Sequence, residues 1–295
     1  MSGPTALPDH AIGPACVPGV PASVHPTVTR VTAPNPSMMT GPGTNTYVVG
    51  DEAVVVIDPG PPIASHLDVV ISVIAGRRVT GVAVTHHHRD HAPAARSLAA
   101  AVDAPVVGRG HVLLTVDVAA DEGTVLDAGS IELVAWHTPG HASDHLCFFA
   151  PATGWLFTGD HLMQGSTVVI RPPDGDLTAY LAAITRVRDD RRVRRLVPGH
   201  GRMLSAPAKA ADEVLTHRAQ RAAIVLDALR AHGPGTAAMI RVHAYADVGP
   251  ERNDVATATC WAHLLALVDE GLATSTAERF DPEAVFEAAV RAPDA

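Results

Sequence analysis

The stretch Val84–Ala92 reads VTHHHRDHA and places four histidines and one aspartate within six consecutive positions. It continues a run of small and β-branched residues, VTGVAVT (Val79–Thr85), which is typical of a buried strand. The loop after the carboxyl end of a strand is where α/β proteins place their ligands. The stretch therefore predicts an α/β protein with a functional site at this strand end.

The spacing His86-x-His88-x-Asp90-His91 suits metal binding. Side chains alternate in direction along an extended segment, so we expect His86 and His88 to face one ion and His87 to point away. Asp90 and His91 follow where the chain turns into the next helix, and they can serve a second ion. Imidazole and carboxylate together suit Zn²⁺, Mn²⁺ or iron.

Three further strand ends each present one side chain that can bind a metal. HTPGH ends in His141, LFTGDH contains Asp160 and LVPGHG contains His200, and each follows an apolar run with a glycine turn. A single histidine at a strand end is usually an ordinary loop residue. The recurrence of the pattern indicates instead that several strand ends converge on one metal centre.

Strands and helices alternate early in the chain, and a run of strands occupies its middle. This order predicts two sheets with helices outside, an α/β sandwich over residues 27–206. Residues 1–26 hold six prolines and several glycines, which predicts a mobile tail. Residues 207–295 contain two or three helical stretches and a short β-like end, which predict a small C-terminal domain.

The composition excludes several classes of protein. The formal net charge of −9 argues against a protein that coats nucleic acid by bulk electrostatics. Three widely spaced cysteines without a CxxC pair indicate neither a disulfide framework nor a zinc finger, and fit a reducing cytoplasm. We find no membrane-spanning apolar run and no signal peptide, and expect a cytoplasmic protein without a membrane partner.

The histidine and aspartate pattern resembles that of the metallo-β-lactamase-fold hydrolases over residues 28–205. GPGTNTYVVG, TPGHASDHLCF and FTGDHLMQGSTVVI are similar to the branch of the mitochondrial β-lactamase-like endoribonuclease and its bacterial relatives. The resemblance implies an αββα sandwich with a two-zinc site and a small C-terminal winged-helix-like domain. Seven ligands are implied: His86, His88 and His141 for the first metal, Asp90, His91 and His200 for the second, and Asp160 between both.

Two divalent ions about 3.5 Å apart can share one water, and zinc lowers the pKa of bound water to about 7. We therefore expect a metal-bridging hydroxide as nucleophile, with Asp90 and Asp160 orienting it. His145 either donates a proton to a leaving group or holds a hydrogen bond near the site. Asp58 either accepts the second ring N–H of a metal-bound histidine or caps a turn.

The ligand set leaves the substrate open. Single-stranded RNA is the first expectation, by resemblance to the endoribonuclease, and an ester or thioester is the alternative, since glyoxalase II and polyketide-releasing thioesterases share the ligands. A persulfide dioxygenase keeps one iron and fewer ligands, and class-B β-lactamases often carry cysteine at the position of Asp160. The run Arg186–Arg195 is either a solvated helix end or a phosphate-tracking patch. Duplex DNA is not expected, because the helix Ala256–Leu272 contains no arginine or lysine.

Overall fold

The computed structural model describes residues 8–289, which form two seven-stranded mixed sheets, a two-stranded sheet and helices around them. The first large sheet has the spatial order β2 (Ala22–His25), β3 (Val28–Thr32), β4 (Asn45–Gly50), β5 (Ala53–Ile57), β6 (Arg78–Ala83), β7 (Val106–Gly108) and β8 (Val118–Ala119). The second has the order β1 (Ala11–Ile12), β14 (Met203–Leu204), β13 (Arg195–Pro198), β12 (Trp155–Gly159), β11 (Leu146–Ala150), β10 (Ile131–His137) and β9 (Val125–Ala128).

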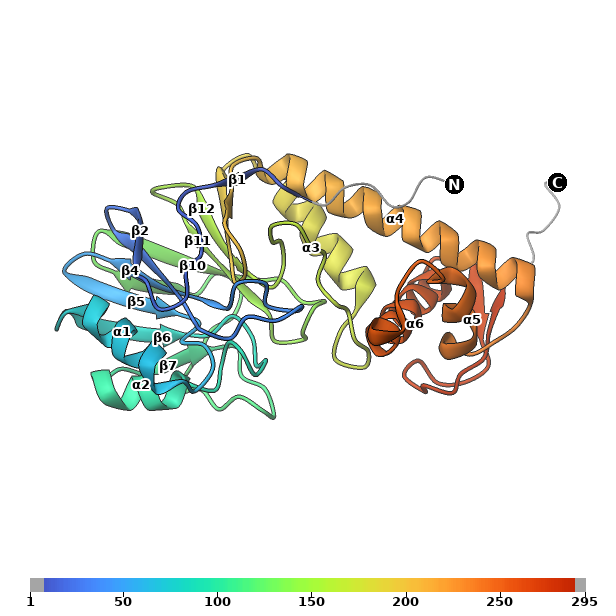
Figure 1. Cartoon of the computed structure of the whole chain (residues 1–295), viewed down its shortest axis with the longest axis horizontal. Coiled ribbons are helices and arrows are strands. Elements are labelled where there is room, and N and C mark those ends of the chain that lie inside the picture. Colours follow the sequence, from blue (N-terminus) through green and yellow to red (C-terminus); the bar gives the residue numbers. More distant parts are fainter. Residues whose placement is uncertain (1–7, 290–295) are drawn as a thin grey trace.

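Helices cover the outer face of each large sheet (Figure 1). The helices α1 (Ala64–Ile74) and α2 (Ala95–Val102) pack on the first sheet, and α3 (Leu177–Asp189) with the first half of α4 (Pro207–His232) packs on the second. The expected αββα sandwich is therefore confirmed.

The central strands β4, β5 and β11 are buried on both faces, and alternate side chains of such a strand enter different cores. In β5, Val55 and Ile57 pack between the two sheets, whereas Val54 and Val56 pack under α1 and α2. This division follows from the period of two along a strand and explains the continuous apolar runs in the sequence. Full burial of one such side chain contributes about 1.5–3 kcal/mol.

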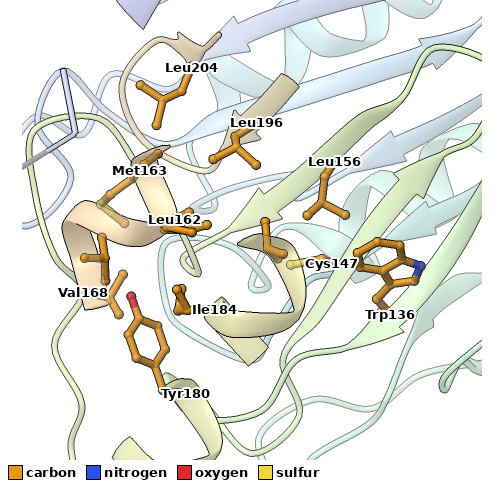
Figure 2. Close-up of a cluster of buried hydrophobic side chains, with 14 of the residues drawn as sticks. Trp136, Cys147, Leu156, Leu162, Met163, Val168, Tyr180, Ile184, Leu196 and Leu204 are labelled. Atoms are coloured by element: carbon orange, nitrogen blue, oxygen red, sulfur yellow. The ribbon is translucent and has the colours of Figure 1, made fainter. Parts of the chain in front are cut away.

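The core between the second sheet and its helices reaches the loops that follow the strands. Trp136, Cys147 and Leu156 line the sheet side of this core, and Tyr180 and Ile184 come from α3 (Figure 2). The loop residues Leu162, Met163 and Val168 belong to the same cluster. The loop after β12 is therefore held by packing and does not extend freely into solvent.

The N-terminal segment differs from the mobile tail that the prolines predict. Ala11 and Ile12 pair with Leu204 and Met203, and Ala22–His25 pairs with β3. Residues 8–26 thus extend both large sheets, and the buried Arg30 guanidinium donates to the carbonyl oxygens of Pro14 and Ala15. Residues 1–7 lie outside the described residues.

The C-terminal region has a core of its own. It consists of the second half of α4 with α5 (Ala237–Ala244), a 3₁₀ turn (Pro250–Arg252), α6 (Asn253–Asp269) and the antiparallel pair β15 (Ala273–Ser275) and β16 (Phe286–Ala288). The helical C-terminal region expected from the sequence is present, and α4 connects it to the sandwich (Figure 1). None of the helices within residues 8–289 combines the length and the apolar character that crossing a membrane would require.

The two large sheets are joined at one edge by hydrogen bonds between strand ends. The Asn45 amide donates to the carbonyl oxygens of Pro198 (3.1 Å) and Gly201 (2.9 Å), and the Tyr47 hydroxyl donates to Pro198 (2.8 Å). The backbone N–H of Asn45 donates to the carbonyl of Gly199 at 2.7 Å. These bonds hold the loop after β13 against the first sheet.

Candidate metal centre

Four loops meet at this edge, and each follows the carboxyl end of a strand. β6 is parallel to β5 in the first sheet and β12 is parallel to β13 in the second, so within each sheet the loops after these strands leave from the same edge. The loops after β6, β10, β12 and β13 carry all seven expected side chains. The structure brings together His86, His88, Asp90, His91, His141, Asp160 and His200.

Three imidazoles form the first cluster. The Nδ1 atom of His88 lies 2.9 Å from Nε2 of His86 and 3.0 Å from Nε2 of His141. The Nδ1–H of His141 donates to the Val169 carbonyl at 2.8 Å, and that of His86 faces the Thr85 hydroxyl at 3.0 Å. The Nε2 atoms of His86 and His141 therefore carry lone pairs. These lone pairs and Nδ1 of His88 point toward one position.

The pKa values of this cluster favour neutral rings. Burial lowers the pKa of His86 well below its usual value and lowers that of His88 to about 3. Burial also lowers the pKa of His141. Nδ1 of His88 can carry at most one proton for the two Nε2 lone pairs that face it, so hydrogen bonding within the cluster satisfies these nitrogens incompletely and the arrangement suits a cation at their centre.

Two imidazoles and a carboxylate form the second cluster. The Nε2 atoms of His91 and His200 lie 3.4 Å apart, and Oδ2 of Asp90 lies 3.3 Å from the first and 3.2 Å from the second. Burial opposes charge on both rings, but Asp160 and Asp90 raise the pKa of His200 to about 9 and that of His91 well above its usual value. The negative charge of Asp90 and Asp160 favours a proton on these rings. The same charge favours a metal cation, which competes with the proton for the ring nitrogens.

Asp160 lies between the two clusters and directs one oxygen to each. Its Oδ1 lies 3.3 Å from Nε2 of His91 and 3.2 Å from Nε2 of His200, while Oδ2 lies 3.6 Å from Nε2 of His141. Oδ1 is buried and has no hydrogen-bond partner among the described residues. Despite burial, the two imidazoles His200 and His91 lower the pKa of this carboxyl well below its usual range. The donor set fits two divalent ions with a shared carboxylate.

Further residues orient these side chains. Oδ2 of Asp58 accepts from Nδ1–H of His91 at 2.8 Å, and the same carboxylate accepts from the backbone and hydroxyl of Thr85. The hydroxyl of Thr44 donates to Oδ2 of Asp90 at 3.0 Å. Asp58 thus has the contact expected of a carboxylate behind a metal-ligating histidine. Thr44 was not expected in this role, although it lies in the stretch GPGTNTYVVG.

His145 does not reach the open side of the centre. It is 0% exposed, its Nε2 accepts from the backbone N–H of Asp160 at 3.2 Å, and its Nδ1–H faces the Thr138 hydroxyl at 2.9 Å. Donation of a proton to a leaving group does not fit this position, because both ring nitrogens already bond within the protein. The other reading, a hydrogen bond beside the site, matches the contacts.

His87 faces the site, although the alternation of side chains predicts the opposite. The segment after Thr85 is not a regular strand, so the period of two ends there. Nδ1 of His87 lies 2.9 Å from Oδ1 of Asp144, which raises the pKa of the ring, and His111 stacks on it with centroids 3.9 Å apart. His87 lines the cavity described next.

A cavity of about 600 Å³ opens over the two clusters. His87, His88, Asp90, His141, Asp160 and His200 form its polar floor. Its walls are largely apolar and include Met38, Met39, Met163, Val168, Val169, Pro172, Pro173 and Val255. Ser166 and Thr167 also line it, and Arg171 and Arg252 are its two arginines.

The arginine run Arg186–Arg195 does not line this cavity. Arg186 pairs with Glu122 at 2.7 Å and lies over the ring of Trp136, and Arg192 pairs with Asp190 at 2.6 Å. Arg186 and Arg192 therefore have few donors left for phosphate. These contacts favour the interpretation of the run as a solvated helix end.

The αββα sandwich and the two clusters are typical of a metal-binding hydrolase. The comparison with known families identifies the superfamily. The family model described as "Metallo-beta-lactamase superfamily" matches residues 39–200. The chain belongs to this superfamily. Its matched segment contains every member of the two clusters and Asp160.

Among its curated relatives is the Beta-lactamase-like protein 2 homolog of Caenorhabditis elegans, 27% identical over 240 residues, which are 75% of this chain and 77% of the relative. The Atrochrysone carboxyl ACP thioesterase of Aspergillus chevalieri is 32% identical over 221 residues, 70% of this chain and 67% of the relative. In fold, the chain is similar to a Beta-lactamase domain protein from Burkholderia ambifaria, with a TM-score of 0.77, 20% identity and 97% of each chain covered. The superfamily and the curated thioesterase relative support a metal-dependent hydrolase.

Proposed function

We propose that the protein is a binuclear zinc hydrolase of acyl thioesters or esters. The observation that carries this substrate class is the apolar wall of the cavity, which extends from Met38 and Met39 to the metal centre. An acyl chain fits such a wall, whereas a polynucleotide requires phosphate contacts along its backbone. The thioesterase relative supports the same choice over single-stranded RNA.

The seven side chains have separate roles in this proposal. His86, His88 and His141 would hold the first ion, and Asp90, His91 and His200 would hold the second. Asp160 would contribute one oxygen to each. When bound, the pair supplies a Lewis acid for a carbonyl oxygen and lowers the pKa of water to about 7. Zinc fits best because three of the ligands are neutral imidazoles around one point.

The remaining residues position the ligands and the substrate. His145 accepts from the Asp160 backbone and so fixes the turn that presents this carboxylate. His87 is held through Nδ1 by Asp144, which leaves Nε2 available toward the cavity. The acyl chain lies along Met163, Val168 and Val169, so that its carbonyl reaches the floor.

The test compares four substrates with one zinc-loaded preparation: an acyl-pantetheine thioester, p-nitrophenyl acetate, end-labelled single-stranded RNA and a chromogenic β-lactam. We expect thioester cleavage that falls by at least about 100-fold in Asp160→Ala and is unchanged in Asp68→Asn, a substitution on the exposed face of α1. RNA cleavage by the parent alone, without thioester cleavage, would replace this proposal with the endoribonuclease.

A further inference from the structure

A second cavity lies away from the metal centre, between α3, α4 and α6. Its volume is about 430 Å³, within the range of roughly 300–1,000 Å³ that small-molecule sites occupy. Leucine and alanine form most of its wall: Leu177, Leu181, Leu215, Ala219, Ala222, Ala223, Leu226, Ala266, Leu267 and Leu272. It shares no residue with the cavity over the metal centre.

Two buried nitrogen-bearing side chains interrupt this apolar wall. Arg218 of α4 is 2% exposed and His263 of α6 is 1% exposed, and both line the cavity. Neither ring nitrogen of His263 has a hydrogen-bond partner among residues 8–289, and neither does Nε of Arg218. Buried polar atoms are nearly always bonded, so the Arg218 Nε–H and the one N–H of the His263 ring indicate a missing acceptor.

Arg218 also lacks a counter-ion. Its Nη2 donates to the carbonyl of Val168, and its guanidinium lies 5.5 Å from the ring centroid of Tyr180. No carboxylate in the described part of the chain forms an ion pair with it, although Arg221, one turn further along, pairs with Asp247 at 3.0 Å. A buried cation without a partner is costly, and an anion beside it relieves that cost.

The surrounding charges determine where such an anion would lie. Arg218 and Arg221 both act on His263, so the potential at the inner wall is positive. The acidic group among the lining residues, Glu270, is exposed and lies at the rim. A carboxylate is therefore attracted to the inner wall, where the guanidinium can bind it and a ring N–H of His263 can donate to it.

We propose that this cavity binds a small carboxylic acid with a hydrocarbon body, its carboxylate against Arg218 and His263 and its chain along the leucines and alanines. Apolar walls with a few convergent polar groups are the usual composition of a small-molecule site. The proposal does not depend on which substrate the metal centre hydrolyses.

The test is isothermal titration of the full chain with decanoate, with 1-decanol as the neutral probe. We expect saturable binding of one decanoate per chain, with decanol at least about tenfold weaker because it lacks the charge that Arg218 attracts. Arg218→Met should weaken decanoate at least about tenfold, and Arg230→Met, an exposed arginine on the same helix, should not.

Ala222→Phe provides a second test if Arg218→Met does not fold. It keeps the guanidinium and fills the cavity, so decanoate binding should be lost while the circular dichroism spectrum is retained. Absence of saturable binding by the parent would overturn the proposal. So would equal affinity for decanoate and decanol, or unchanged binding in Ala222→Phe.

Discussion

Oδ2 of Asp58 accepts a hydrogen bond from Nδ1 of His91 at 2.8 Å, and this bond links the first sheet to the second metal cluster. The same carboxylate binds the backbone N–H and hydroxyl of Thr85, the residue before His86. One side chain at the end of β5 therefore holds His91 of the second cluster directly and His86 of the first cluster through the Thr85 hydroxyl. Its backbone has φ of 49°, a left-handed conformation that aspartate and asparagine tolerate better than most residues.

Asp58→Asn should weaken zinc binding by roughly 10–100-fold, because the amide keeps the turn but binds the His91 ring without a full negative charge. Competition with a chromophoric zinc chelator measures the affinity. Asp68→Asn, exposed on α1, is the matched control and should bind zinc as the parent does. Parental affinity in Asp58→Asn would show that the carboxylate serves only the turn.

Asp160→Ala should reduce the zinc content from about two ions per chain to one or fewer, since it removes the oxygens that face both clusters. Metal analysis after dialysis measures this stoichiometry. Zinc at 100 times its Kd stabilises a site by about 2.7 kcal/mol, so the parent should also lose thermal stability when EDTA is added. Two tightly held ions in Asp160→Ala would contradict the proposed position of this carboxylate.

Gly140→Ala should destabilise the turn that presents His141. Gly140 has φ of 134°, and a Cβ there would lie 2.4 Å from the backbone nitrogen of Tyr180, which cannot move without displacing α3. We expect a loss of at least about 3 kcal/mol in unfolding free energy. Gly123→Ala also has positive φ but meets no atom within 4 Å, so it should cost only about 1–2 kcal/mol.

The metal-free protein should lose stability as the pH falls below about 6.5. Burial lowers the pKa of His66 from 6.5 to about 4, so the unfolded chain takes up a proton in this interval and the folded protein does not. Each such histidine lowers the free energy of unfolding by about 1.4 kcal/mol for every pH unit in this interval. Urea unfolding in EDTA between pH 7 and 4 measures the slope, which His66→Gln should reduce by about that amount.

The sequence predicted the sandwich and the positions of the clustered side chains because both depend on local patterns. Apolar runs that end in glycine mark strand ends, and ligands at strand ends of parallel neighbours must meet. His87 departed from its predicted direction because the chain leaves the extended conformation after Thr85. The role of Asp144 in holding His87 depends on a contact across 57 residues, which no local pattern contains.

Local sequence patterns also failed to predict the N-terminal strands and the start of α5. Ala11 pairs with Leu204, which lies near the other end of the sandwich in sequence. Prolines on either side of this strand make its local sequence typical of a loop. The glycines and proline before Thr236 mark a break, but Thr236 itself caps the next helix by accepting from the N–H of Met239. Long-range pairing overrides local composition in the first case, and a capping residue restarts a helix in the second.

The carbonyls of Val168 and Val169 have different partners. Arg218, from the long helix α4, donates to the first, and the second accepts from the ring of His141. The orientation of a side chain in the catalytic sandwich thus depends on a helix that also builds the C-terminal region. The residues that support the metal centre therefore extend beyond the sandwich into α4. A fragment that ended with the sandwich would lose the Arg218 contact to the loop that orients His141.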